Sequence, residues 1–494
     1  MPKDLYVHNS LTREKSLFVP LHAGHVGMYV CGPTVYNDVH LGNCRSFVSF
    51  DIIFRTLRYL GYKVRYVRNI TDVGHLLDDG EDRIAKGARL EQLEPMEIVE
   101  KYTNGFHDIM RILNVLPPSI EPRATGHIIE QIEMVKAILE SGLAYEINGS
   151  VYFDTVKFSK EQGVYGQLSG RIIEDLLQET RDLNKQDEKR HPADFAIWMK
   201  AEPEHIMRWN SPWGEGFPGW HLECSAMSTK YLGKTFDIHG GGSDLKFPHH
   251  ENEIAQNYGA CGCAPARYWL HGNMLLLNGK KMSKSDGNTI SPYELFTGES
   301  EWITKGYGPM VVRFFMLQAH YRSTLDITDG ALQAAEKGFS RLMETWKTLH
   351  NLPQATGKVD GELDLEIRSN LDAAMDDLCD DFNTPRVLAR FFEIAPRINA
   401  LKGGQITLEQ VRQETLDLVK KQMAELLFDV FGLKEEADQA ASGITDKLMS
   451  LILDIRMEAR LGKDWPMADK IRDGLKAAGI VVKDGNEGSS WGRE

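Results

Sequence analysis

A strand–helix–strand unit near the amino terminus constrains the fold of this chain more than any other feature. Residues 26–31 read as a short strand, 41–60 as a helix with apolar side chains at helical spacing, and 63–68 as the next strand. Two strands joined in this way run parallel, and a parallel sheet binds its ligand beyond the carboxyl ends of its strands. The predicted fold class is therefore α/β, with a Rossmann-like parallel sheet that begins here.

The pattern changes beyond Pro117-Pro118, which predicts an insertion over residues 118–190 that splits the sheet. A helix is expected around 128–141. The alternating residues 145–153 read as a hairpin that turns at Asn148-Gly149. The charged stretch 179–190 has no apolar periodicity and closes the insertion.

The parallel sheet is expected to resume after the insertion, with a strand at 235–239 and a helix at 249–258. After about residue 330 the long amphipathic stretches predict a helical bundle. The Ser/Gly-containing break at 441–443 predicts a small terminal unit.

Composition narrows the class of protein. A chain of 494 residues is too long for one hydrophobic core, so several domains are expected. No apolar run approaches the roughly 20 residues that span a bilayer, and the amino terminus lacks a targeting segment, so we expect no membrane role and a cytoplasmic protein. The net charge of −14 argues against a broad basic nucleic-acid surface. A nucleic-acid partner would need a local basic patch.

The first segment that could carry chemistry is 33–43, between the first strand and its helix. Helix amino termini favour phosphates, Gly42 would let a nucleotide approach the backbone, and His40 and Asn43 add polar side chains. Taken alone, such a string is more often an ordinary loop with a satisfied histidine.

The second segment is a lysine-rich loop at 280–288. Mobile lysines can stabilise the charge of a departing pyrophosphate, although a lysine cluster by itself is usually a solvated loop. Together the two segments resemble the HIGH and KMSKS motifs of class I aminoacyl-tRNA synthetases. KMSKS stands intact at 281–285, whereas Asn43 replaces the final histidine of the first motif.

A third set of residues could bind a metal. The six cysteines of a long cytosolic chain suggest thiols or metal ligands rather than disulfides. His249 and Glu253 are spaced i, i+4 on the expected helix, and with Cys31 and Cys224 they would complete a tetrahedral shell for Zn²⁺. His250 is also within one turn of Glu253, so spacing alone does not choose between the two histidines. Any one of these residues alone would more often be core, and the pair Cys261 and Cys263 is interpreted as structural.

The arrangement of these residues closely resembles that of cysteinyl-tRNA synthetases. The resemblance covers nearly the whole amino-terminal half, including the strings 69–72, 237–242 and 247–253. It implies the following roles. The zinc ligands are Cys31, Cys224, His249 and Glu253; Trp220 and Thr34 bind substrate; His40, Gly42, Asn43 and Lys284 bind ATP; and His40, Asn43, Lys281 and Lys284 act in catalysis. The sequence departs from many family members at Asp72-Val73-Gly74-His75, where an acidic run is common.

The resemblance implies a two-step reaction with ATP, L-cysteine and tRNA(Cys), with Mg²⁺ accompanying ATP and a monomeric enzyme. Cysteine and serine are near-isosteres that shape separates poorly. Zinc that recognises the substrate thiolate would remove this difficulty, since a preference of roughly 5 kcal/mol supplies several thousandfold discrimination. Two rival functions are a cysteine ligase of mycothiol synthesis and a non-catalytic nucleotide-binding module. The first has no need of the carboxyl-terminal third, and the intact loop 281–285 argues against the second.

The resemblance also assigns roles to the predicted domains. These are a catalytic domain at 1–117 and 191–295, an insertion at 118–190, a stem-contact region at 296–330, a tRNA-positioning bundle at 331–440 and an anticodon-binding domain at 441–494. In the last of these, Arg456, Arg460 and Lys463 share one face of an expected helix. Three basic residues are more often a solvated face, but Trp465 and Trp491 add aromatic surface on which unpaired bases could stack.

Overall fold

The computed structural model forms two compact units, residues 1–433 and 434–494, which are described separately. The structure describes residues 3–494 except 74–83, 85–87, 89–92, 172–187, 204, 283–286, 359–360, 436–448, 450, 461, 463, 478–479, 486–487 and 494. Among the described residues, no helix has the length and apolar character needed to cross a membrane.

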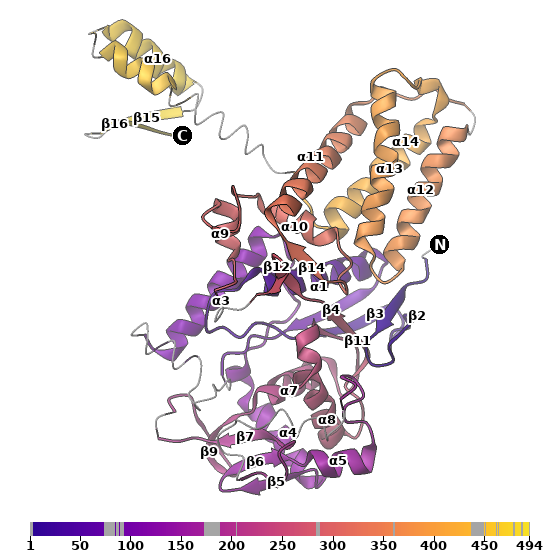
Figure 1. The fold of residues 1–494 in the computed structure, drawn as a ribbon, viewed down its shortest axis with the longest axis vertical. Coiled ribbons are helices and arrows are strands. Elements are labelled where there is room, and N and C mark those ends of the chain that lie inside the picture. The colour runs from indigo at the N-terminus through magenta and orange to yellow at the C-terminus, as the bar shows by residue number, and fades with distance from the viewer. Residues whose placement is uncertain are drawn as a thin grey trace. The chain divides into compact units, whose positions relative to one another are not determined.

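A four-stranded parallel sheet lies in the middle of the first unit (Figure 1). Its strand order is β11-β10-β3-β4, and all three pairings are parallel. The strands are β3 (His25–Val30), β4 (Lys63–Arg68), β10 (Phe236–Gly242) and β11 (Ala266–Gly272). The helix α1 (Leu41–Tyr59) joins β3 to β4, as the sequence predicts, and buries Phe50 and Ile53 against the sheet. The central pair β3 and β10 comes from two segments about 200 residues apart, so the predicted split sheet is confirmed.

A second sheet is formed largely by the chain between the two halves of the parallel sheet. It is antiparallel, with the order β5-β6-β7-β9-β8. The predicted hairpin is confirmed, because Asn148 and Gly149 both have positive φ between β5 and β6. The strands are β5 (Ala144–Ile147), β6 (Ser150–Phe153), β7 (Phe195–Lys200), β8 (Trp209–Ser211) and β9 (Gly214–Pro218). The sheet thus takes strands from both sides of residue 190.

Helices pack around these two sheets. The predicted helices near 128–141 and 249–258 are confirmed as α4 and α8. The helices of this part are α3 (Pro95–Ile112), η1 (Ala124–His127), α4 (Ile128–Glu140), α5 (Thr155–Gln162), α7 (Trp220–Leu232), η3 (Ser243–Lys246) and α8 (His249–Cys261). The helices α7 and α8 lie against each other and carry several of the candidate site residues.

A small three-stranded sheet follows β11 and leads into the lysine-rich loop. It consists of β12 (Leu275–Leu277), β13 (Lys280–Lys281) and β14 (Leu325–Ile327), with β12 in the centre. The helices α9 (Pro292–Thr297) and α10 (Pro309–Leu317) lie between β13 and β14 in sequence. At the amino terminus, β1 (Tyr6–Asn9) and β2 (Glu14–Leu17) form an antiparallel pair beside β11.

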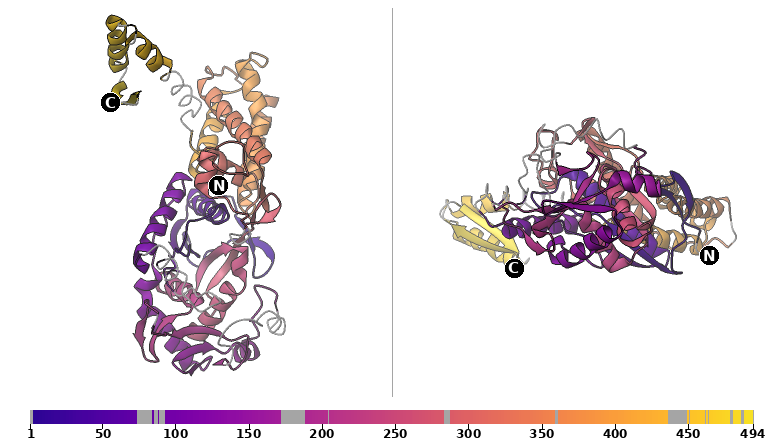
Figure 2. Two further views of the ribbon diagram at one scale, coloured as in Figure 1. Left: turned by 60° about the vertical axis from the view of Figure 1, so that its left-hand side comes forward. Right: turned by 90° about the horizontal axis from the view of Figure 1, so that it is seen from below.

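The predicted helical bundle follows β14 (Figures 1 and 2). Its apolar faces form a continuous core with residues of α1, α3 and α10. Its helices are α11 (Asp329–Asn351), α12 (Glu362–Cys379), α13 (Thr384–Lys402), η4 (Leu408–Gln410), α14 (Gln413–Ala424) and the π-helix η5 (Glu425–Val430).

The second unit contains a helix over 451–460, the helix α16 (Trp465–Ala477) and the hairpin β15 (Ile480–Gly485) and β16 (Gly488–Arg493). The prediction of an exposed basic face on this unit is wrong at Arg456. Arg456 is only 6% exposed, and Leu453, one turn before it, belongs to the small apolar core of this unit. Lys463 and the predicted break at 441–443 lie outside the described residues. Trp465 is 56% exposed and remains available to a partner.

Candidate active site

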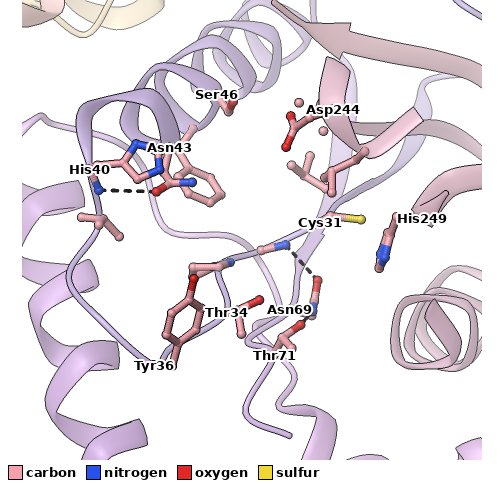
Figure 3. A pocket seen from close by; sticks show the side chains of 18 of the residues that line it. Cys31, Thr34, Tyr36, His40, Asn43, Ser46, Asn69, Thr71, Asp244 and His249 are labelled. Carbon is pink, nitrogen blue, oxygen red and sulfur yellow. Dashed lines mark hydrogen bonds between the residues drawn. The ribbon is translucent and has the colours of Figure 1, made fainter. Parts of the chain in front are cut away.

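The carboxyl ends of β3 and β10 open into a cavity of about 700 Å³, the place where a parallel sheet is expected to bind its ligand. In Figure 3, His40 and Asn43 lie on one side of this cavity and Cys31 and His249 on the other. Seven of the candidate residues line it: Cys31, Thr34, His40, Asn43, Trp220, Cys224 and His249. Residues nearly 220 positions apart in sequence therefore meet at one site.

The first turn of α1 is closed by its own side chains. His40 occupies the N-cap with extended backbone, and its Nδ1 accepts from Gly42 N–H at 3.1 Å. Asn43 Oδ1 accepts from His40 N–H at 3.4 Å (Figure 3). The two bonds form a reciprocal cap, so the asparagine that departs from the family motif serves here as a capping acceptor.

The turn after β3 is held by Asn69, which the sequence did not single out as a site residue. Gly32 N–H donates to Asn69 Oδ1 at 2.9 Å, and Asn69 Nδ2 donates to Thr71 Oγ1 at 3.0 Å (Figure 3). Asn69 and Thr71 both line the cavity. Both residues lie in the string 69–72, and that part of the family resemblance was the sequence feature that could have identified them as site residues.

Cys31, Cys224 and His249 line the cavity, and Glu253 converges with them on one point. The two Sγ atoms lie 3.6 Å apart. His249 Nε2 lies 3.4 Å from Cys224 Sγ and 3.3 Å from Glu253 Oε1. Cys31 Sγ lies 3.6 Å from the same carboxylate oxygen. All four side chains are buried, and Cys31 is the most exposed of them at 8%.

These spacings fit a tetrahedral metal site. Donors bound to one zinc ion, at about 2.3 Å for sulfur and about 2.0–2.1 Å for nitrogen or oxygen, are separated by roughly 3.3–3.8 Å. The four measured separations fall within or close to that range. The group could therefore hold a metal ion without moving its side chains far.

A second potential group shares Cys31 and Glu253 but takes His239 and His250 as its histidines. It fits a metal less well, because His239 Nε2 lies 2.8 Å from Glu253 Oε2, which is a hydrogen-bond distance. His250 itself resembles His249, because its Nδ1 lies 2.8 Å from His271 Nε2 and its Nε2 lies 3.3 Å from Cys31 Sγ. His249 is among the described residues that line the cavity, whereas His239 and His250 are not. The geometry therefore favours His249.

Two further histidines orient the members of this group. His221 Nδ1 lies 2.9 Å from His249 Nδ1, which leaves Nε2 of His249 toward the thiols. His239 binds one oxygen of Glu253 and leaves the other toward Cys31. Such outer contacts are typical of metal ligands. Sequence reasoning did not assign either histidine, although His221 follows Trp220 and His239 lies in the string 237–242.

Burial sets the protonation of the thiols. It raises the pKa of Cys31 well above its usual range, and the hydrogen bond with Cys224 adds to this effect. Burial also raises the pKa of Cys224. Both thiols are therefore neutral at physiological pH unless a cation is bound, and a bound metal ion favours the thiolate form that ligates it.

Trp220 forms part of the wall beside this group. It is the first residue of α7, and its ring centroid lies 4.6 Å from that of His249. The ring therefore bounds the space next to the potential metal ligands.

The lysine-rich loop reaches the cavity through Met282. Lys281 is exposed in β13, opposite Leu276 of β12, and Asn288 Nδ2 donates to Lys281 O at 3.1 Å across the base of the loop. Met282 and Thr289 line the cavity. Residues 283–286, including Lys284, lie outside the described residues.

The remaining sequence candidates lie apart from the four-donor group. Asp72 accepts from Thr125 N–H at 2.8 Å and Thr125 Oγ1–H at 2.6 Å, and burial raises its pKa. His75 lies outside the described residues. Cys263 Sγ accepts from Thr235 Oγ1–H at 3.4 Å, and neither Cys261 nor Cys263 joins a potential metal group among the described residues.

Family models and relatives match the chain over nearly its whole length. Residues 17–337 match the model for tRNA synthetases class I (C) catalytic domain, and residues 373–435 match the DALR domain. The cysteine–tRNA ligase of Bacteroides fragilis is 54% identical over 497 residues, covering 99% of each chain. The same enzyme of Chlorobaculum tepidum is 48% identical over 509 residues, again covering 99% of each chain.

Solved structures share the fold at low identity. A methionyl-tRNA synthetase of Mycobacterium tuberculosis, in complex with methionyl-adenylate, has a TM-score of 0.62 and 13% identity. The match covers 85% of this chain and 93% of that one. A leucyl-tRNA synthetase ternary complex from Agrobacterium radiobacter has a TM-score of 0.56 and 12% identity, covering 84% and 85% of the two chains.

Proposed function

Since this chain belongs to the cysteine–tRNA ligases, a family of class I tRNA synthetases, we propose that its cavity performs both steps of cysteine attachment to tRNA. The cysteine carboxylate attacks the α-phosphorus of ATP, which forms cysteinyl adenylate and releases pyrophosphate. The 3′-terminal ribose hydroxyl of tRNA(Cys) then attacks the adenylate and releases AMP. One observation supports this most: two buried thiols and an imidazole line the same cavity as the amino terminus of α1, and a buried carboxylate lies beside them.

The amino terminus of α1 is proposed to bind the phosphates of ATP. The side chains of His40 and Asn43 line the cavity at its positive dipole end, and Gly42 between them has no side chain that would cover the backbone. Lys281 and Lys284 complete the phosphate site from the other motif, and Mg²⁺ accompanies ATP. These groups position the reactants and stabilise charge, so no covalent enzyme intermediate is needed.

Cys31, Cys224, His249 and Glu253 are proposed to hold one zinc ion. When bound, the ion supplies a Lewis-acidic centre that bonds a thiolate and discriminates against a hydroxyl. His221 and His239 keep His249 and Glu253 turned toward the thiols. Trp220 limits the size of the side chain that enters, and Thr34 borders the same space. Together these residues would select cysteine over serine and over larger amino acids.

The carboxyl-terminal regions are proposed to bind tRNA(Cys). The DALR match falls on the bundle, which supports the tRNA-positioning role assigned to residues 331–440. The stem-contact role of 296–330 and the anticodon-binding role of 441–494 are part of the same proposal. The enzyme is proposed to act as a monomer in the cytoplasm.

The test measures each step separately. Purified protein should catalyse cysteine-dependent exchange between ATP and pyrophosphate, reject serine, contain about one zinc per chain and charge tRNA from total tRNA. Absence of exchange with cysteine would refute the proposed function. Exchange without tRNA charging, but with transfer of cysteine to an amino sugar, would support the rival ligase instead.

A further inference from the structure

Arg45 is a buried guanidinium at the start of the helix that carries the first motif. It is 2% exposed, and its position two residues after Asn43 places it within the first turns of α1. Among the described residues, the acceptors that the structure assigns to it are three backbone carbonyls. They belong to Met274, His320 at 3.3 Å and Ser323. Burial lowers its pKa to about 10, so the side chain still carries its charge at neutral pH.

These three carbonyls connect Arg45 to the second motif. Met274 directly precedes β12, which pairs with β13 at the base of the lysine-rich loop. The two motifs meet at the cavity, because Met282 Cε lies 3.9 Å from where a side chain at Gly42 would begin. A single planar side chain thus ties the start of α1 to the strand that leads into the other motif.

The segment 320–323 also contacts the helical bundle, through its side chains. Asp381, in the turn between α12 and α13, accepts from Tyr321 Oη–H at 2.9 Å and from Arg322 Nε–H at 2.6 Å. His320 Nε2 lies 2.9 Å from Asp381 O. The segment therefore presents carbonyls to Arg45 and side chains to the bundle turn.

The bundle turn is held in an unusual backbone conformation. Asp381 and Phe382 have φ of 61° and 57°, which non-glycine residues rarely adopt and which persist only when the surroundings enforce them. Here Asp381 N–H donates to Tyr6 O at 2.9 Å, and Phe382 is buried in the core formed with Phe50 of α1. The turn is thereby anchored to the catalytic half on several sides.

We propose that Arg45 is a positioning residue for adenylate formation, and that residues 320–323 link it to Asp381 so that the bundle helps to set the spacing of the two ATP motifs. The proposal rests on the proposed function, since it assumes that these motifs bind ATP. Arg45 does not touch the reactants; it holds the two segments that do. Its loss should slow chemistry without weakening cysteine binding, because the potential zinc ligands are carried by other segments.

The experiment measures steady-state ATP–pyrophosphate exchange for four single variants and one double variant of the full-length protein. Arg45→Lys keeps the charge but loses the planar fork, whose two separate nitrogens reach Met274 O on one side and His320 O and Ser323 O on the other. Asp381→Asn and Tyr321→Phe weaken the other side of the link. Asp377→Asn is the matched control, because it alters a buried carboxylate of α12 whose partners are Arg386 at 2.8 Å and Arg390 at 3.0 Å. The double variant combines Arg45→Lys and Asp381→Asn.

We expect Arg45→Lys to lower kcat for exchange by roughly 10–100-fold, as misplacement of a reacting group by about 1 Å does, with the KM for cysteine within about twofold. Asp381→Asn should lower kcat in the same direction, and the double variant should lose less than the product of the two single losses. Asp377→Asn should stay within about twofold of the wild type in kcat. Zinc content should be unchanged throughout.

Three results would overturn the proposal. These are a normal kcat in Arg45→Lys, independent effects in the double variant, and an equal loss in Asp377→Asn. If Asp381→Asn does not fold, as judged by its urea unfolding midpoint, Tyr321→Phe replaces it, since that change removes only a hydroxyl. A wild type without cysteine-dependent exchange would instead refute the proposed function, so the two failures can be told apart.

Discussion

Replacing Gly42 by alanine should abolish most of the adenylation activity while leaving the protein folded. A Cβ atom at this position would lie 2.8 Å from His40 Cε1 and 2.9 Å from His40 Nδ1. The first distance is about 0.6 Å short of the 3.4 Å at which ordinary contact begins. The His40 ring must therefore move, and the cap bond from Gly42 N–H to its Nδ1 is lost.

The expected effects on stability and activity differ in size. Loss of an N-cap contact costs about 0.5–2 kcal/mol, whereas Gly→Ala in a helix gains up to about 1 kcal/mol, so the net change in stability is small. A displacement of this order in a group proposed to bind ATP should lower kcat for pyrophosphate exchange by roughly 10–100-fold. The assay is ATP–pyrophosphate exchange at saturating cysteine, with the urea midpoint measured in parallel.

Gly330→Ala is a closely matched control. Gly330 is also the second residue of its helix, and its N-cap Thr328 also accepts from the first turn, but no atom lies within 4 Å of a Cβ there. We expect this variant to retain full activity and to be as stable as the wild type or slightly more so. A Gly42→Ala enzyme with kcat within about threefold of the wild type would refute the role given to His40.

Three further predictions follow from the site and the domain assignment. Cys224→Ser should lower both the zinc content and the discrimination against serine, as measured by metal analysis and by exchange assays with cysteine and with serine. If neither quantity changed, the assignment of Cys224 as a ligand would be wrong. Lys284→Ala should slow adenylate formation far more than it raises the KM for cysteine, whereas Lys280→Ala should leave both quantities nearly unchanged. A raised KM for cysteine with unchanged turnover in Lys284→Ala would contradict the role given to Lys284. Removal of the residues after Gly443 should leave ATP–pyrophosphate exchange unchanged but lower kcat/KM for tRNA by roughly tenfold to several hundredfold, because each stacked base contributes about 1–3 kcal/mol. Normal tRNA charging by the truncated protein would argue against an anticodon-binding tail.

Local patterns in the sequence determined most of the architecture. Apolar spacing placed β3, α1 and β4, and the pair Asn148-Gly149 placed a hairpin turn, because each depends on residues close together in the chain. Parallel strand pairing followed from the single helix between two strands. The boundaries of the domains remain predictions.

Contacts between distant segments decided the details of the site. Both His249 and His250 lie within one turn of Glu253, so helix periodicity could not separate them. The tertiary structure places His249 beside Cys224 in the lining of the cavity, and His250 between Cys31 and His271 outside that lining, because β3, α7 and β11 supply those neighbours from elsewhere in the chain. The sequence did not indicate roles for His221, His239 and Arg45 for the same reason, because each of them acts on a partner that lies on another segment of the chain.

Burial likewise depends on tertiary packing rather than on residue type. Helix periodicity placed Arg456 and Arg460 on one face, but Arg456 is buried. The amide oxygen of Asn43 caps the backbone of His40, a contact that the sequence pattern did not indicate. The sequence alone determines which residues can share a helix face or follow a strand. Which of them meet, and which way their polar atoms point, is decided only when segments far apart in the chain pack against one another, because hydrogen bonds and burial depend on neighbours in space.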